Sequence, residues 1–214
     1  MQMPKDEVRD GIVAAVDAAV RESESLQSRL SKRCALTDYS GFAKRSANGS
    51  VVWTEAFQRA RNENEVVVVP ASSTPYLVDG TPVVASNRRI EAEGATVRLA
   101  TDTRTLMLRN AFVMDGTLTP VPRGFRDSNI VIRGGVWEVW CSRRRGYGST
   151  GRMNEGPREL GNFFGVLALF YFGNCNHVSV TEATFRHAGA FAVQCGDGDA
   201  FRFEDIVFDR FKKA

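Results

Sequence analysis

Residues 168–190, ALFYFGNCNHVSVTEATFRHAGA, and residues 191–213, FAVQCGDGDAFRFEDIVFDRFKK, decide the predicted fold, because the second stretch repeats the pattern of the first. The two stretches are equally long and align without a gap. Gly173 falls on Gly196, and Val180 falls on Phe203. Self-similarity at a fixed period of this size is typical of architectures built from stacked repeats.

A looser copy of the pattern lies about two periods earlier in the chain. There Ile132 matches Val180, and Trp137 matches Phe185. A unit of this length that holds two or three short strands corresponds to one coil of a parallel β-helix, which buries its apolar face only when coils stack. The sequence therefore predicts an all-β parallel β-helix, or solenoid, of about six coils over residues 65–213, counting an insertion at 141–163.

The segments before the predicted coils carry helical patterns. Apolar residues recur at steps of three and four over residues 5–33, which predicts an amphipathic helix. Residues 36–50 have the composition of a linker, and residues 54–62 read as a short helix capped by Thr54 that covers the open edge of the first coil. Short strands follow from Glu65 onward. The predicted organisation is an N-terminal helix and linker over 1–50 and the coils over 51–214.

The composition is that of a globular protein. Of the 214 residues, 43% are hydrophobic and 25% are charged, which excludes a disordered chain. The formal net charge of +3 is low for a nucleic-acid binder, and no apolar run is long enough to span a membrane. The four cysteines lack CxxC spacing, so neither zinc nor a disulfide framework is predicted, and we expect no metal and no cofactor.

The N-terminus, MQMPKDEVRD, lacks the apolar core of a signal peptide. The sequence as it stands predicts a cytoplasmic protein, or a secreted or periplasmic one from which a leader was removed.

Several segments together resemble a known family. They are Thr54-Glu55-Ala56, the strand Val66–Pro70, Ser86-Asn87, the stretch 93–99 (EGATVRL), the stretch 129–137 (NIVIRGGVW) and the stretch 189–194 (GAFAVQ). Over roughly residues 50–213 the chain resembles the N-terminal half of the pectate-lyase-like right-handed β-helix proteins, closest to the polygalacturonase-type glycosidases of glycoside hydrolase family 28. The resemblance implies a right-handed coil and the hydrolysis of a polysaccharide, often one rich in uronic acid, by an inverting pair of carboxylates.

The catalytic motifs of that family do not occur in this sequence. They are Asn-Thr-Asp, Gly-Asp-Asp, Gly-His-Gly and Arg-Ile-Lys, and the stretch Gly196–Asp199 reads Gly-Asp-Gly-Asp instead. We therefore expect the N-terminal portion of a polysaccharide-degrading glycosidase that is inactive alone because its catalytic coils are missing. The alternative is a noncatalytic β-helix that binds glycans or serves as an adhesion or tailspike-like stem.

The candidate site residues come from the alternation and from one loop. Asp197 and Asp199 are the best carboxylate pair, but their alignment with Asn174 and Asn176 favours a hydrogen-bonded turn ladder over catalysis or cation binding. Side chains that share a parity point to one face. The outward-facing or groove-side candidates for sugar binding are Tyr171, Gln194 and His187, joined by Arg143, Arg144 and Arg145 of the 141–163 loop.

The partner predicted on these grounds is a polysaccharide, with neither nucleic acid nor a membrane. A second expectation concerns the last coil, which would leave Phe203, Phe208 and Phe211 uncapped. An open coil of this kind predicts self-association through the C-terminal end.

Overall fold

The computed structural model describes residues 32–46, 49–100, 103, 106–112, 126–139, 168–187 and 191–209. The chain divides into two compact units, Met1–Arg33 and Cys34–Ala214. Nearly all described residues belong to the second unit. Outside the described residues lie most of the helix expected over 5–33, the loop expected over 141–163 with Arg143, Arg144 and Arg145, and Phe211. No helix in the described part of the chain is long and apolar enough to cross a membrane.

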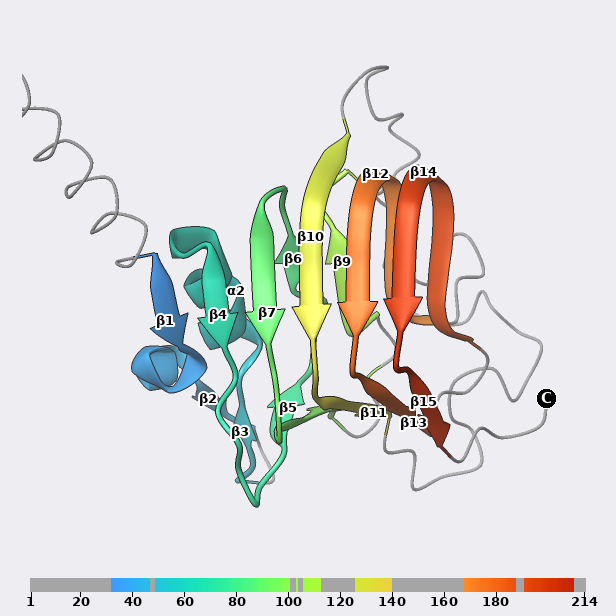
Figure 1. Cartoon of the computed structure of the whole chain (residues 1–214). Coiled ribbons are helices and arrows are strands. Elements are labelled where there is room, and N and C mark those ends of the chain that lie inside the picture. The colour runs from blue at the N-terminus through green and yellow to red at the C-terminus, as the bar shows by residue number, and fades with distance from the viewer. Residues whose placement is uncertain are drawn as a thin grey trace, which may run out of the picture. The chain divides into compact units, whose positions relative to one another are not determined.

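The described residues form two mainly parallel β-sheets. The eight-stranded sheet A has the order β1 (Arg33–Ala35), β4 (Val66–Val68), β7 (Arg88–Glu91), β10 (Asp127–Arg133), β12 (Ala168–Thr181), β9 (Leu108–Asn110) and β6 (Val83–Val84), with β14 (Phe191–Glu204) also paired to β12. The seven-stranded sheet B has the order β15 (Val207–Asp209), β13 (Thr184–Arg186), β11 (Val136–Val139), β8 (Thr96–Leu99), β5 (Tyr76–Val78), β3 (Val51–Val52) and β2 (Lys44–Arg45). Figure 1 shows β7, β10, β12 and β14 side by side and pointing the same way.

Within the described residues, two helices accompany the sheets. The 3-10 helix η1 (Leu36–Phe42) and β2 occupy much of the segment that was expected to be a linker. The helix α2 (Thr54–Glu63) forms where the sequence predicts it, but its N-cap is Trp53 rather than Thr54. The Thr54 hydroxyl instead donates to Asp79 Oδ1 at 2.6 Å and accepts the Asp79 backbone N–H at 2.8 Å.

The predicted fold class, an all-β right-handed parallel β-helix of about six coils, is wrong. The structure is a mixed arrangement of sheets with helices, in which sheet A curls into a half-barrel and β2 pairs antiparallel with β3. The alternation and spacing of residues predict neighbouring strands, but not where one strand ends. A turn was expected at Asn174, yet β12 runs on for 14 residues, with Asn174 and His177 in left-handed conformation at φ 49° and 54°.

The pairing of strands does follow the offset read from the sequence. Phe170 pairs with Val193 and Val180 with Phe203, as in the gapless alignment of the two repeats. Ile132 pairs with Val180 and Trp137 with Phe185, as the looser copy predicts. In parallel strands, paired residues point to the same face, so the offset places apolar side chains next to one another.

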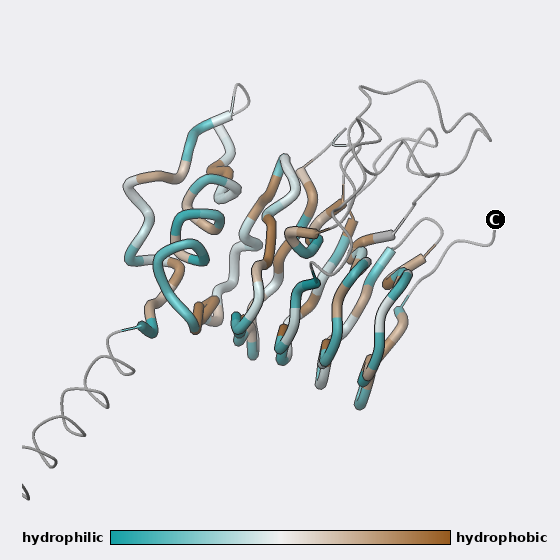
Figure 2. Tube along the Cα trace, turned by 90° about the horizontal axis from the view of Figure 1, so that it is seen from above, coloured by the Kyte–Doolittle hydropathy of each residue, from teal (hydrophilic) through white to brown (hydrophobic). Residues whose placement is uncertain are grey.

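Aromatic side chains form the centre of the core. Trp137, Phe170 and Phe185 are fully buried, and the Phe170 ring meets the Trp137 ring at 4.9 Å and the Phe185 ring at 5.1 Å, both edge to face. In β8, Val97 and Leu99 are buried and alternate with half-buried Thr96 and Arg98. Figure 2 shows hydrophobic and hydrophilic residues following one another along the strands, as expected when one face packs on a core and the other meets solvent.

Candidate functional site

The register of sheet A brings together two of the sequence-predicted residues and adds a third. Tyr171 on β12 pairs with Gln194 on β14 and, on its other side, with Arg109 on β9. Paired residues of parallel strands share a face, and neighbouring strands lie ~4.8 Å apart, so the three side chains form a row about 10 Å long. We call Arg109, Tyr171 and Gln194 the polar row. All three side chains are half-buried.

The Tyr171 ring is held in place by its surroundings. It packs against the buried Leu106 side chain. A side chain added at Gly173 or Gly196 would meet the Tyr171 hydroxyl within 3.5 Å, so the ring end lies over these two paired glycines. Burial, with smaller contributions from Cys175 and Cys195, raises the pKa of Tyr171, and the hydroxyl therefore remains a hydrogen-bond donor at neutral pH.

The polar row presents groups that suit an acidic sugar. A guanidinium such as that of Arg109 binds a carboxylate through two parallel hydrogen bonds, and its Nη1 already donates to the Asn110 carbonyl at 3.2 Å. The tyrosine offers a ring face and a hydroxyl, and the Gln194 amide offers donors and an acceptor.

The cysteines near the polar row do not supply a nucleophile. Cys175 is buried, and burial raises the pKa of its thiol to about 12. Cys195 is exposed, and only partial desolvation raises the pKa of its thiol, to about 11. Both thiols therefore stay protonated near neutral pH, and the thiolate is the reactive form. Within the described residues no three His, Cys, Asp or Glu side chains gather in a way that could hold a metal ion.

Asp197 and Asp199 lie on the exposed bend of β14, next to an arginine that sequence analysis missed. The Arg126 guanidinium lies 3.6 Å from Asp197 Oδ1 and 3.9 Å from Asp199 Oδ2, and it donates to Asn176 Oδ1 at 3.3 Å. The Asp199 backbone N–H donates to the same Asn176 oxygen at 3.3 Å. These contacts fit the polar ladder that the alignment of Asn176 with Asp199 predicts.

The residue after Arg126, Asp127, forms a buried polar pair with Asn110. The Asp127 carboxylate accepts hydrogen bonds from the Asn110 amide at 2.8 Å, the Phe112 backbone N–H at 2.9 Å and the Ser86 hydroxyl at 3.0 Å. Asp127 is 1% exposed and Asn110 is not exposed. A buried carboxylate with this many donors stabilises the fold and leaves little capacity for a ligand.

The remaining sequence-predicted residues lie apart from the polar row. His187 follows β13 of sheet B, with its backbone N–H donating to the Asp209 carbonyl at 3.1 Å, so it does not join the strands that carry Tyr171 and Gln194. The sequence pattern did not point to Arg109, which lies on β9. The number of residues between Arg109 and Tyr171 is not a multiple of the number between Tyr171 and Gln194. The repeat in the sequence therefore does not predict that Arg109 and Tyr171 pair.

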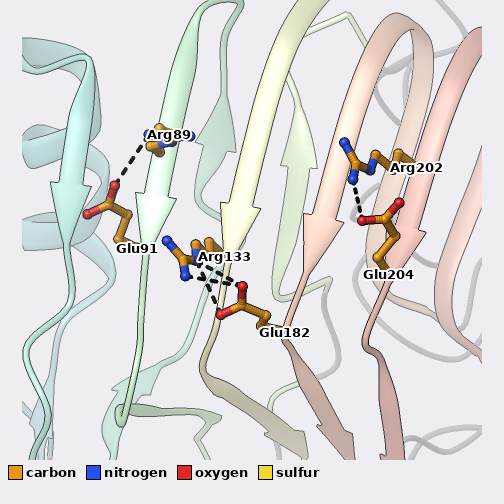
Figure 3. Close-up of polar contacts among 6 residues, drawn as sticks. All are labelled: Arg89, Glu91, Arg133, Glu182, Arg202 and Glu204. Carbon is orange, nitrogen blue, oxygen red and sulfur yellow. Dashed lines mark hydrogen bonds and ion pairs between the residues drawn. The ribbon is translucent and has the colours of Figure 1, made fainter.

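Another stretch of sheet A carries paired charges, drawn in Figure 3. The Arg133 guanidinium contacts both Glu182 carboxylate oxygens at 3.2 Å through its Nε, Arg202 pairs with Glu204, and Arg89 lies 3.6 Å from Glu91. Because each of these arginines has a carboxylate partner, the stretch carries no excess positive charge to attract an anionic chain.

Comparisons with known proteins find a likeness in fold. No protein-family model matches the chain, and no curated protein matches it significantly. The fold is similar to the crystal structure of a putative glycosyl hydrolase from Parabacteroides merdae ATCC 43184, with a TM-score of 0.56 and 16% identity over 83% of this chain and 77% of that chain. At this identity the likeness concerns the fold. Nothing matched supports glycoside hydrolase family 28.

Proposed function

We propose that this glycoside hydrolase-like chain binds an acidic polysaccharide through the polar row. The observation that carries the proposal is the register that sets Tyr171 between Arg109 and Gln194 on one face of sheet A. A uronic acid offers a carboxylate for the guanidinium, an apolar ring face for the tyrosine and hydroxyls for the amide. The fold similarity to a putative glycosyl hydrolase favours a sugar polymer over other anionic partners.

The proposal is tested by isothermal titration calorimetry with oligogalacturonate. A neutral cello-oligosaccharide of the same length is titrated in parallel. We expect the wild-type chain to prefer the acidic oligosaccharide. Arg109→Gln should weaken its binding about tenfold, because a charge-assisted bidentate contact is worth roughly 1.5–3 kcal/mol. Gln194→Ala should weaken binding of the acidic oligosaccharide as well.

Arg89→Gln is the matched control, because Arg89 also lies on a strand of sheet A but pairs with Glu91 away from the polar row. It should bind as the wild-type chain does. Equal affinity of the wild-type chain for the acidic and the neutral oligosaccharide, or the same loss in Arg89→Gln as in Arg109→Gln, would refute binding through the polar row.

Hydrolysis is a second candidate function, and the fold similarity to a putative glycosyl hydrolase is the observation that favours it. Asp197 and Asp199 follow Gln194 on the same strand and are the carboxylates nearest to it in sequence. Release of reducing sugar from polygalacturonate that is lost in both Asp197→Asn and Asp199→Asn would support this second function. Binding without any release of reducing sugar would favour a noncatalytic glycan-binding protein.

A further inference from the structure

A cavity lies beside sheet B, away from the strands of the polar row. Its volume is about 500 Å³, within the range of small-ligand sites. The lining of the cavity includes two aromatic side chains, three hydroxyl side chains and one charged side chain. They are Trp53, Tyr76, Thr37, Ser72, Thr74 and Arg98. We call this cavity the Trp53 pocket.

The two aromatic rings form a fixed wall of the Trp53 pocket. Their centroids lie 5.1 Å apart and their planes make an angle of 73°. The Trp53 backbone N–H donates to the Leu77 carbonyl at 2.7 Å, which ties the start of α2 to β5. Tyr76 is 5% exposed and belongs to the main core. The wall is therefore preformed, which lowers the entropic cost of binding a ligand.

Each ring carries a polar group that makes no hydrogen bond within the described residues. Across the described ranges, neither the Trp53 indole N–H nor the Tyr76 hydroxyl makes a hydrogen bond, although such groups usually find a partner when their rings are buried. Both polar atoms still reach solvent, since the buried and unpaired side-chain atoms of the described residues are the two of Arg61. Two unpaired donors thus belong to residues that line the Trp53 pocket.

The charge at the Trp53 pocket is compensated. Arg98 is paired with the carboxylate of Glu138, whose side chain is 3% exposed. The hydroxyl residues Thr37, Ser72 and Thr74 are exposed and carry no charge. A neutral ligand with several hydroxyl groups matches such a lining better than an anion does, because the guanidinium already holds a carboxylate.

We propose that the Trp53 pocket binds one unit of a neutral saccharide. The apolar face of the sugar ring lies on the Trp53 indole, and the sugar hydroxyls accept hydrogen bonds from the indole N–H and the Tyr76 hydroxyl. Thr74 supplies a further hydroxyl at the rim. This site is separate from the polar row and does not depend on the function proposed for it.

Saturation-transfer NMR and calorimetry with cellobiose and methyl β-glucoside test the inference. We expect saturable binding in the millimolar range to the full chain. Tyr76→Phe, which removes only the hydroxyl, should weaken binding about fivefold to tenfold, the value of one hydrogen bond of about 1 kcal/mol or slightly more. Thr74→Ala changes an exposed residue and serves as a second variant should Tyr76→Phe unfold.

Tyr39→Phe is the matched control, because it removes a tyrosine hydroxyl that donates to Glu63 Oε2 at 2.7 Å outside the Trp53 pocket. It should leave the affinity for cellobiose unchanged. The inference is overturned if the wild-type chain shows no saturable binding of either sugar. It is also overturned if the folded Tyr76→Phe and Thr74→Ala variants both bind as the wild type does.

Discussion

Arg61 is a buried cation on α2 without a compensating partner for two of its nitrogens. The residue is 2% exposed, and among the described residues its Nε and Nη1 atoms have no hydrogen-bond partner. Arg88 donates from its Nε to the Arg61 carbonyl at 3.1 Å, which brings a second guanidinium close. Burial, and next the repulsion from Arg88, lower the pKa of Arg61 to about 9, against a smaller opposing effect of Asp127. The charged side chain therefore destabilises the native state.

Arg61→Met should raise the free energy of unfolding by about 1–3 kcal/mol, because it replaces an unsatisfied buried cation with an apolar chain of similar length. Urea unfolding at neutral pH measures this gain. Arg61→Ala is the control, and it should be less stable than Arg61→Met because it leaves a cavity. A methionine variant less stable than the wild type would show that the guanidinium is compensated.

The same residue predicts a pH dependence. Because the folded-state pKa lies below the unfolded one, the native state loses the proton above about pH 9 while the unfolded chain keeps it. The unfolded state then binds more protons than the native state. The free energy of unfolding of the wild type therefore rises with pH relative to that of Arg61→Met. The difference in unfolding free energy between the two proteins should therefore shrink from about pH 8 to about pH 10.

Among the elements, α2 protects an edge of sheet A. The Gln58 amide donates to the Val83 carbonyl at 3.3 Å and accepts the Val83 backbone N–H at 2.7 Å. A single side chain thus satisfies both backbone groups of an edge residue, as a neighbouring strand would. Unpaired edges invite association with other strands, and this contact covers part of the edge of sheet A at β6.

Gln58→Ala should lower the free energy of unfolding by about 1–3 kcal/mol, since it leaves two partly buried backbone groups of Val83 without partners. Urea denaturation followed by circular dichroism measures the loss. Arg59→Ala, at the next position of α2, removes an exposed ion pair with Glu55 and a contact with the Phe42 ring, and it should cost less than about 1 kcal/mol. Equal losses in the two variants would argue against the edge role of Gln58.

In the molecule taken whole, the other end of the sheets is less well covered. In the described ranges no strand pairs with the outer edges of β14 and β15. Phe203 is 41% exposed and Val207 is 54% exposed. An apolar cavity of about 580 Å³ lies beside them, lined in part by Phe185 and Ile206. Self-association through this end stays a prediction, and these exposed side chains are the groups that would be buried by it.

Phe203→Lys should shift the protein toward the monomer, because a lysine at an open edge blocks pairing with a second chain. Sedimentation velocity over a range of concentrations measures the shift. Phe42→Lys changes an exposed phenylalanine on η1 and should leave the association unchanged. A wild-type chain that stays monomeric at high concentration would refute self-association through β14 and β15.

The sequence was sufficient for the pairing of the strands that repeat at one offset. Apolar residues that alternate and recur at one regular offset predict which side chains lie next to each other, and Phe170 with Val193 and Trp137 with Phe185 are neighbours in the structure. The local pattern also predicts the helix at 54–62, which agrees with α2 to within one residue. These features depend on contacts between residues close in sequence, or on one regular offset, and both leave a periodic signal.

The fold class and the composition of the polar row depended on contacts that leave no such signal. Left-handed residues such as Asn174 and His177 let β12 continue through an expected turn, so sheet A curls where separate strands of a β-helix were predicted. Arg109 reaches Tyr171, and Arg126 reaches Asp197 and Asp199, across irregular intervals of the chain. Such contacts are set by where the packed core brings distant strands together, and alternation within a strand does not encode that distance.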